Sequence, residues 1–455
     1  MTPRRALLLA FTAIGLLTGP TLAQDLAAPG PYFAGTMAVT VSRPNGSTFA
    51  ATLHYPALSD GAGAPFDNSG APYPAITFGH GFLQAVTQYT STIKHLATHG
   101  FFVIASQSEG GLFPSHGNFA SDLRHSLSWL EQQHALANSP FFAAVQVDRF
   151  GASGHSMGGG AALLATAADQ RIVAVATTAA AETSPSAIAA LALIDVPIRL
   201  IAGSDDSIVP PESSLDPMYA GASAPKQALL IDGGFHCGFT DGSFLFCDSG
   251  AITRPAQLAI TRRLLTEFFL AHLRRDQSLW PAVWGPELPD PSETSMLRDA
   301  GIAIALSKAT LSAAPGFAAG AQLTITNTGP IASTFSFFTE PVEGWSTSWS
   351  MATSPLLPPG ATAVVTLTAH ASFHPIDIDL LISARREADG ATRGYATATL
   401  VALPPTPDFN GDGAIDGADL GVLLSAWGPG PSIADLNEDG VVDGDDLGIL
   451  LSVWE

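Results

Sequence analysis

Basic residues are scarce in this chain, and their scarcity limits its partners. The 455 residues include 19 Lys and Arg against 40 Asp and Glu, which gives a net charge of −21. Nucleic acids and anionic membrane surfaces are bound through basic patches. The charge balance therefore predicts no nucleic-acid partner and no membrane partner. Because no Lys, Arg or His follows Leu403, the acidic excess is concentrated at the C-terminus.

Long apolar runs are also lacking, except at the N-terminus. Two arginines precede an apolar run from Ala6 to Leu17, which is short for a bilayer span, and TLAQ offers a cleavage site after Ala23. This pattern predicts a signal peptide over residues 1–23 and a secreted or cell-surface protein. A retained N-terminal anchor is the alternative.

Cysteine is nearly absent, since only Cys237 and Cys247 occur. An exported protein meets an oxidising environment, which favours a disulfide between them that closes a short loop. Two free buried thiols are the alternative.

Apolar residues are plentiful, at 46 % of the chain, and the length predicts two to four domains. Between residues 25 and 280, apolar segments such as AITFGH, FFVIAS, IVAVATT and QALLIDGG read as strands and alternate with amphipathic helical patterns. This alternation predicts an α/β fold whose mostly parallel sheet carries helices on both faces. The helices are expected at 88–99, 120–134, 158–168 and 256–273, and an antiparallel hairpin is expected around Pro44-Asn45-Gly46.

Residues 281–455 divide into segments of different composition and hydrophobic pattern. Scattered prolines predict a linker over 281–307. Residues 308–403 alternate short strands with Gly, Pro and Asn turns, which predicts a small immunoglobulin-like β-sandwich. A Pro-rich spacer at 404–407 precedes an internal repeat over 408–455.

Each repeat spaces oxygen ligands like a calcium loop, at loop positions 1, 3, 5, 7, 9 and 12, with glycine at the sharp turn of position 6. An apolar helical pattern follows each loop, which predicts one apolar face per helix: Leu420, Leu423, Leu424 and Trp427, then Leu447, Leu450, Leu451 and Trp454. The predicted structural Ca²⁺ ligands are Asp408, Asn410, Asp412, the carbonyl of Ala414, Asp416 and Asp419, then Asp435, Asn437, Asp439, the carbonyl of Val441, Asp443 and Asp446.

The paired loops and helices resemble a type I dockerin domain, which implies a cohesin-like protein as partner. The recognition pair that such domains carry at loop positions 10 and 11 is replaced here by Gly417-Ala418 and Gly444-Asp445. Calcium binding is therefore the better supported of the two expectations, and an acidic disordered tail is the alternative.

The stretch RFGASGHSMGGGAALLA places Ser156 between glycines, where a predicted strand meets a predicted helix. GHSMG fits G-x-S-x-G, a sharp turn that raises the serine Oγ above the sheet, and Gly154 and Gly158 permit the close packing. The helix N-terminus favours negative charge at this point. The pattern predicts Ser156 as a nucleophile.

A nucleophilic serine needs a base that is itself held by an acid. The order Ser, acid, His is met by LIAGSDDSIVP, with Asp205 and Asp206, and by LIDGGFHCGF, with His236. Both segments follow predicted strands, at the edge where open α/β sheets bind ligands. We predict a triad of Ser156, Asp206 and His236. Asp205 is the alternative acid, and a loop histidine without a role is the alternative for His236.

An oxyanion on the attacked carbonyl needs two N–H donors. Met157, after the nucleophile, is expected to supply one, and Phe82 in the loop FGHGFLQ is the best candidate for the other. The Phe82 ring is also a candidate for the acyl-binding wall. No metal or other cofactor is expected in the chemistry.

Together these motifs resemble the polyester hydrolase (PET hydrolase/cutinase) and dienelactone hydrolase branch of the α/β-hydrolases. The segments that carry the resemblance are STIKHLATHGFFVIA, VDRFGASGHSMGGGAALLA, GSDDSIVP and GGFHCGF. The resemblance implies the acid role for Asp206, the base role for His236 and oxyanion contacts for Phe82 and Met157.

Two departures from this branch affect the expectations. Its polyesterases carry a tryptophan after the strand that follows the nucleophile helix, whereas TTAAAETSPSA has Thr183 and Ser184 there, which weakens the case for aromatic polyesters. The usual cysteine near the acid is absent too. Cys247 is therefore the expected partner of Cys237, in a bridge that would brace the His236 loop.

The sequence thus predicts a secreted serine esterase that cleaves carboxylic esters through an acyl-enzyme, in the manner of a cutinase or polyester hydrolase. One alternative is an acetyl or feruloyl esterase that acts on plant polysaccharides in a dockerin-mediated assembly. An alternative of another class is a non-catalytic surface or matrix-binding protein.

Overall fold

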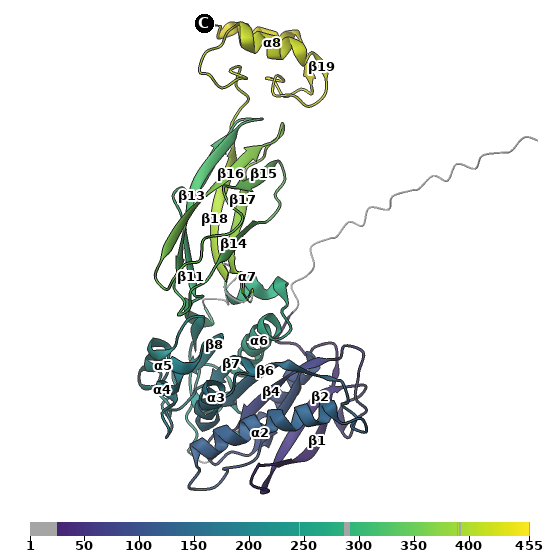
Figure 1. The fold of residues 1–455 in the computed structure, drawn as a ribbon, viewed down its shortest axis with the longest axis vertical. Coiled ribbons are helices and arrows are strands. Elements are labelled where there is room, and N and C mark those ends of the chain that lie inside the picture. The colour runs from purple at the N-terminus through teal and green to yellow at the C-terminus, as the bar shows by residue number, and fades with distance from the viewer. Residues whose placement is uncertain (1–24, 245, 286–291, 389, 391–392, 455) are drawn as a thin grey trace, which may run out of the picture.

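A computed structural model describes residues 25–244, 246–285, 292–388, 390 and 393–454. Three bodies follow one another along the molecule: an α/β domain, a β-sandwich and a small helical C-terminal module (Figure 1). The expected signal peptide over residues 1–23 lies outside the described residues.

The α/β domain is built on a twisted, mostly parallel sheet. In the described part of the chain this sheet has ten strands, in the order β10-β9-β8-β7-β6-β4-β5-β2-β1-β3. Neighbouring strands from β5 to β9 run parallel, whereas β1, β2 and β10 pair antiparallel. The strands are β1 (Phe33–Ser42), β2 (Thr48–Ala57), β3 (Gly61–Ala62), β4 (Tyr73–Gly79), β5 (Phe102–Ser106), β6 (Val145–His155), β7 (Ile172–Thr178), β8 (Ile198–Gly203), β9 (Lys226–Ile231) and β10 (Thr294–Asp299).

Helices cover both faces of this sheet, as the sequence predicts. Helices α1 and α6 bury Ile93, Leu96, Leu264 and Phe268 in one core. Helices α2 and α3 lie on the other face, where a leucine stripe of α2 is buried, formed by Leu123, Leu127 and Leu130 (Figure 1). The helices of this domain are α1 (Thr90–Thr98), α2 (His116–Ala135), α3 (Met157–Ala167), α4 (Ala187–Ala190), α5 (Leu215–Gly221), α6 (Arg254–His272) and α7 (Trp280–Val283), with short 3-10 turns η1 (Val86–Tyr89), η2 (Leu191–Leu193), η3 (Pro211–Ser213), η4 (His236–Phe239) and η5 (Gln277–Leu279).

The linker expected over 281–307 is corrected by the structure. Among its described residues, β10 adds to the edge of the α/β sheet beside β9, and β11 (Ile302–Leu306) belongs to the sandwich. Only Ala300 and Gly301 separate the two strands, and Gly301 has a φ of +78°. Because β10 is largely solvent-exposed, its sequence lacks the apolar run that would have revealed a strand.

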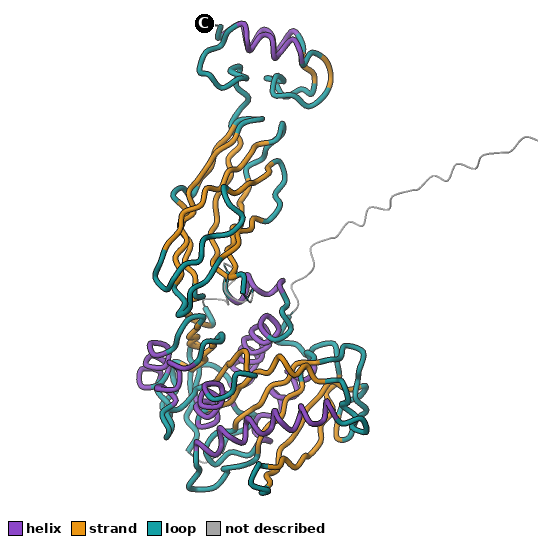
Figure 2. Tube along the Cα trace, viewed as in Figure 1, coloured by secondary structure: helices purple, strands orange, loops and turns teal. Residues whose placement is uncertain are grey.

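The β-sandwich consists, within the described residues, of two four-stranded sheets, β11-β13-β16-β15 and β12-β18-β17-β14. It appears in Figure 2 as strands joined by loops. Its apolar interior is continuous with Trp280 and Trp284 of the α/β domain. Its other strands are β12 (Thr310–Ala313), β13 (Ala318–Asn327), β14 (Phe335–Thr339), β15 (Trp345–Trp349), β16 (Thr362–Ala371), β17 (Ile378–Arg386) and β18 (Arg393–Ala402).

The C-terminal module holds α8 (Gly417–Ser425) and α9 (Gly444–Ser452), joined by β19 (Gly428–Pro429) and β20 (Val441–Val442). The predicted apolar faces are only partly buried. Leu423 and Leu450 lie in a small core, whereas Leu424, Trp427, Leu451 and Trp454 are 40–52 % exposed. The faces extend beyond this core because two nine-residue helices bury little surface against each other. Nowhere in the described residues is a helix both long and apolar enough to cross a membrane.

Candidate active site

Ser156 sits at a strained corner between β6 and α3. Its φ of 55° and ψ of −122° fall where residues other than glycine are costly, a cost that a fixed functional geometry can require. The corner is tight because glycines line it. A Cβ built on Gly158 would lie 2.1 Å from the Gly79 carbonyl oxygen, and one on Gly154 would lie 2.4 Å from the Gly158 oxygen. The predicted strand-serine-helix turn is therefore present.

His236 and Asp206 meet at the same edge of the sheet. Asp206 follows β8 and His236 follows β9, and both side chains are buried. His236 Nδ1 lies 2.8 Å from Asp206 Oδ2. The other carboxylate oxygen, Oδ1, accepts the N–H groups of Ile208 at 3.0 Å and Val209 at 2.7 Å. These contacts fix the carboxylate against the imidazole.

Asp205, the alternative acid, is engaged elsewhere. Its Oδ2 accepts the N–H of Ala251 at 2.9 Å, and its Oδ1 lies 3.2 Å from Ser204 Oγ. Of the two adjacent carboxylates, only Asp206 contacts His236 in the described structure.

The pairing with Asp206 sets the chemistry of the imidazole. A carboxylate only accepts, so His236 Nδ1 must carry hydrogen, and in the neutral ring Nε2 then keeps a lone pair. His236 and Ser156 line the same cavity, of about 500 Å³. The arrangement can therefore supply a base beside the serine hydroxyl.

Two backbone N–H groups border the same serine. Met157 is the first residue of α3, so its N–H has no acceptor within the helix. The N–H of Phe82 donates to no backbone carbonyl among the described residues. Both residues line a cavity with Ser156. The two residues predicted to donate to the oxyanion thus line one cavity with the serine, and their role as donors stays a prediction.

Asp248 supports this site through hydrogen bonds to its loops, a role that the sequence did not predict. Its Oδ2 accepts the N–H of His236 at 2.8 Å, and its Oδ1 accepts the N–H of Cys237 at 2.9 Å. Ser207, next to Asp206, also donates its N–H to Asp248 Oδ2, at 3.3 Å. One carboxylate therefore ties the acid loop to the histidine loop. The sequence did offer one sign of this role, because Asp248 directly follows Cys247, the expected disulfide partner of Cys237.

A second missed group lies behind His236. The ring of His155 packs 4.5 Å from that of His236, centroid to centroid. Its Nδ1 lies 2.9 Å from Tyr89 Oη, which in turn accepts the Gly81 N–H at 2.9 Å. Burial, and then the proximity of His236, hold the pKa of His155 well below its usual value. His155 is thus a neutral link between His236 and the loop of Phe82. The sequence feature that could have indicated this role is its place beside Ser156 in GHSMG.

The predicted disulfide between Cys237 and Cys247 is confirmed. It closes the loop that starts next to His236 and ends next to Asp248. The covalent bond and the Asp248 contacts together restrain the histidine loop.

Two grooves meet at Ser156. The histidine-side groove, with His236, is lined by Phe82, Leu83, Ile208, Phe244 and Phe246 and is strongly apolar. The far groove, also about 500 Å³, mixes Leu112 and Phe113 with polar residues. Those polar residues are His116 and Glu182.

The segment after β7, which lacks the tryptophan of the polyesterases, contributes Glu182 to the far groove. Thr183 is buried and turned away, since its hydroxyl donates to the Pro185 carbonyl at 2.6 Å. The Ser184 N–H donates to His116 Nδ1 at 3.0 Å, which leaves Nε2 of a neutral His116 as a donor. Glu182 Oε2 accepts the Ile188 N–H at 2.9 Å.

The two C-terminal loops share one internal geometry. The first aspartate of each loop, Asp408 or Asp435, accepts the N–H of the position-6 glycine at 2.9 Å. Both glycines have a φ of +87°. The last aspartate, Asp419 or Asp446, is buried and accepts N–H groups from positions 2, 3 and 9.

All predicted side-chain ligands in these loops are carboxylate or amide oxygens, the donor type that Ca²⁺ takes. The described residues nevertheless include no group of three or more His, Cys, Asp or Glu positioned to hold a metal ion. The donor chemistry and the backbone turns fit calcium, and calcium binding stays a prediction.

Comparison with known proteins agrees with this geometry over the α/β domain. No curated protein matches the chain significantly. A family model described as PET hydrolase-like matches residues 14–248, a range that contains Ser156, Asp206 and His236. The chain therefore belongs to the PET hydrolase-like family of α/β ester hydrolases.

Proposed function

We propose that this protein is a secreted serine hydrolase that cleaves carboxylic esters through Ser156, His236 and Asp206. The observation that carries the proposal is the 2.8 Å contact between Asp206 and His236 Nδ1, in a cavity that also holds the strained Ser156. Membership of the PET hydrolase-like family supports the ester bond as the target.

The proposed reaction follows from the positions of these groups. Ser156 Oγ attacks the ester carbonyl carbon while His236 Nε2 takes the hydroxyl proton. The carbonyl oxygen becomes an oxyanion and accepts the N–H groups of Met157 and Phe82. His236 then gives the proton to the leaving alkoxide, which departs as the alcohol. A water attacks the acyl-enzyme by the same route, releases the acid and restores the serine, while Asp206 stabilises the imidazolium.

The two grooves support a proposal for where the two sides of the ester bind. Because His236 protonates the leaving oxygen, the alcohol must lie in the histidine-side groove. The acyl group then lies in the far groove, against Leu112 and Phe113. Phe113, in the far groove, is 96 % exposed, and Phe246, in the histidine-side groove, is 86 % exposed. Such exposed apolar side chains favour an extended apolar ester, such as a polyester or cutin-like chain, over an acetylated sugar.

The test is hydrolysis of p-nitrophenyl esters, from acetate to long acyl chains, by the full-length protein. Ser156→Ala and Asp206→Asn are each expected to lower kcat by about 10⁴-fold or more. Asp205→Asn is the matched control and should retain activity within about tenfold, since Asp205 does not contact His236. Equal activity of Ser156→Ala and the wild type would contradict the proposal. Absence of activity in the folded wild type would favour the non-catalytic alternative.

Preference along the same series separates the two esterase candidates. Faster turnover of medium and long acyl chains, and release of acid from an aliphatic polyester film, are expected for a polyester hydrolase. Activity restricted to acetate or feruloyl esters would instead favour the carbohydrate esterase, whose support is the resemblance of the C-terminal module to dockerins.

For the C-terminal module we propose structural Ca²⁺ binding and attachment to a cohesin-like protein. The repeated loop geometry and the exposed side chains of Trp427 and Trp454 support this role. Calorimetry of the EDTA-treated full-length protein should give two Ca²⁺ per chain, and one in Asp408→Ala. Esterase activity should not change in that variant. Lack of Ca²⁺ binding at millimolar concentration would contradict the proposal.

Export is proposed from the N-terminal sequence. N-terminal sequencing of protein recovered from the culture medium should start at Gln24. An intact Met1 on cell-associated protein would instead support the retained anchor.

A further inference from the structure

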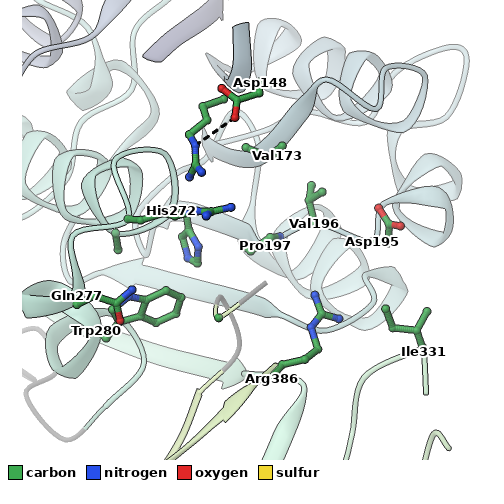
Figure 3. A pocket seen from close by; sticks show the side chains of 14 residues that line it. Asp148, Val173, Asp195, Val196, Pro197, His272, Gln277, Trp280, Ile331 and Arg386 are labelled. Carbon is green, nitrogen blue, oxygen red and sulfur yellow. Dashed lines mark ion pairs between the residues drawn. The ribbon is translucent and has the colours of Figure 1, made fainter. Parts of the chain in front are cut away.

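A second cavity lies between the α/β domain and the β-sandwich, at the opposite end of the parallel strands from Ser156. Its volume is about 290 Å³, and Arg149 of β6 lines it. Val173 of β7 and Pro197 just before β8 belong to the same wall (Figure 3). Seven residues of extended chain separate Arg149 from Ser156, or roughly 20 Å. The cavity is therefore separate from the candidate active site.

Three arginines from three elements line this cavity. Arg149 comes from β6, Arg275 follows α6, and Arg386 ends β17 of the sandwich. The Arg386 side chain extends from the sandwich toward Val196 and Pro197 of the α/β domain (Figure 3). Burial, and then the charge of Arg275, lower the pKa of Arg149. In a chain with 19 basic residues and a net charge of −21, such a cluster is a local concentration of positive charge.

Two acidic residues among the described ones line this cavity, and both are exposed. The Asp148 side chain is 71 % exposed, and its nearest oxygen is 3.7 Å from Arg149 Nε. Asp195 is also exposed and attracts Arg386 through its charge. The charges of Arg149 and Arg275 are thus incompletely compensated by the acidic residues described at the cavity.

Buried donors lie at the cavity wall. Trp280 is 2 % exposed, and its indole Nε1–H finds no acceptor among the described residues. The buried Nε of Arg149 likewise has no hydrogen-bond partner in the described chain. A buried donor without an acceptor costs free energy, so the described part of this wall is short of hydrogen-bond acceptors.

The rest of the wall is apolar. The Trp280 ring, Val173, Pro197 and Ile331 face the same space. Ile331 and Arg386 come from the sandwich, so the cavity is complete only where the two domains meet. Arg393 fixes this junction, because it donates to Gln277 Oε1 and lies 5.1 Å from the centre of the Trp280 ring.

From this geometry we propose that the interdomain cavity is a binding site for a small organic carboxylate. The carboxylate contacts the guanidinium groups, and the apolar body of the ligand lies against Trp280, Val173 and Ile331. Guanidinium groups pair with carboxylates through two parallel hydrogen bonds, and the apolar wall disfavours a fully hydrated inorganic anion. The site would hold the two domains together more firmly when occupied. The proposal is independent of the proposed esterase activity.

The experiment is calorimetric titration of the full-length protein with benzoate, benzamide and inorganic phosphate. Benzoate should bind at one site, and benzamide, which has a similar shape but no charge, should bind at least about tenfold more weakly. Phosphate should also bind at least about tenfold more weakly than benzoate. Equal affinity for benzamide would overturn the role of charge, and equal affinity for phosphate would overturn the choice of an organic ligand.

Variants locate the site. Arg386→Gln should weaken benzoate binding about tenfold or more, and so should Arg275→Gln, whose exposed position tolerates substitution. Arg385→Gln is the matched control, because Arg385 is the strand neighbour of Arg386 and lies over the Phe338 ring instead. Unchanged affinity in folded Arg386→Gln and Arg275→Gln would overturn the proposal. Benzoate bound in the active site would give that result. Failure of the wild type to bind benzoate would overturn it as well.

Discussion

At the scale of single residues, Asp248 shows how much of the proposed triad depends on a group outside it. Its two oxygens accept N–H groups from His236, Cys237 and Ser207. In Asp248→Asn one of these oxygens is replaced by an NH₂ group. Two hydrogen-bond donors then face each other, and one of the hydrogen bonds to the loop is lost. We expect kcat for p-nitrophenyl esters to fall about ten- to a hundredfold with little change in KM, because the imidazole is displaced.

The matched control for this variant is Asp232→Asn. Asp232 is an exposed carboxylate four residues before His236. It should keep kcat within about twofold, since exposed substitutions have small effects. If Asp248→Asn turned over substrate like the wild type with its fold intact, Asp248 would have no positioning role.

The order of residues along the chain was enough to predict the acid and the base but not their supports. Ser156, Asp206 and His236 each follow a predicted strand, and parallel strands bring such positions to one edge. His155 ends β6 directly before Ser156 and so lies within this pattern, whereas Asp248 and Tyr89 belong to none. These two reach the site through turns and side-chain contacts, whose geometry depends on the folded loops.

At the scale of elements, the close approach of β4, β6 and α3 depends on glycine. A Cβ on Gly158 would lie 2.1 Å from the Gly79 oxygen and 2.5 Å from the His80 oxygen, both backbone atoms that cannot rotate away. Gly158→Ala should therefore lower the free energy of unfolding by about 3 kcal/mol or more and abolish esterase activity. Chemical denaturation monitored by circular dichroism measures the first effect.

Gly117→Ala is the control, because its added methyl would be 3.5 Å from the Pro185 ring, an ordinary contact. Alanine is also the better helix former within α2, so stability should be equal or slightly higher. Comparable stability of the Gly158→Ala protein and the wild type would show that the turn relaxes more easily than its geometry indicates.

Helices and strands could be predicted where burial in the core produces a regular spacing of apolar residues along the sequence. The buried strands β4 to β9 and the stripe on α2 carry strong patterns, and the structure confirms them. Strand β10 has a single buried residue, Thr294, so its pairing with β9 left little trace in the sequence. In the helices of the C-terminal module the pattern was strong but the burial is weak. The apolar spacing predicted one buried face per helix, and two short helices bury only part of these faces.

At the scale of the whole molecule, the two large domains are joined more closely than a linker would allow. Strand β10 continues into β11 through two residues, and one apolar core runs from the α/β domain into the sandwich. Trp280 and Trp284 lie at this junction beside His272. Domain motion about the junction would expose this apolar surface, so we expect the sandwich to hold a fixed position on the α/β domain.

The stability of the α/β domain should depend on pH through five buried histidines, His54, His95, His99, His155 and His272, whose pKa values burial lowers. Burial lowers the pKa of His54 to about 4, of His95 to about 4 and of His272 to about 3. In the unfolded chain their pKa is about 6.5, so the unfolded state binds protons first as the pH falls. The stabilisation is thus complete above pH ~6.5 and is lost toward pH 4, by up to about 1.4 kcal/mol per pH unit for each histidine.

Chemical denaturation of the full-length protein between pH 7.5 and pH 5.0 tests this expectation. The free energy of unfolding of the α/β domain should fall below pH 6.5, and His95→Gln should reduce the slope by about one fifth, since one of five protons is removed. Glutamine can keep the donor to the Leu26 carbonyl, which His95 Nε2 approaches at 3.0 Å. His370→Gln, an exposed site in the sandwich, is the control and should keep the wild-type slope. A slope that His95→Gln leaves unchanged would mean that this histidine accepts its proton in the folded state as readily as in the unfolded chain.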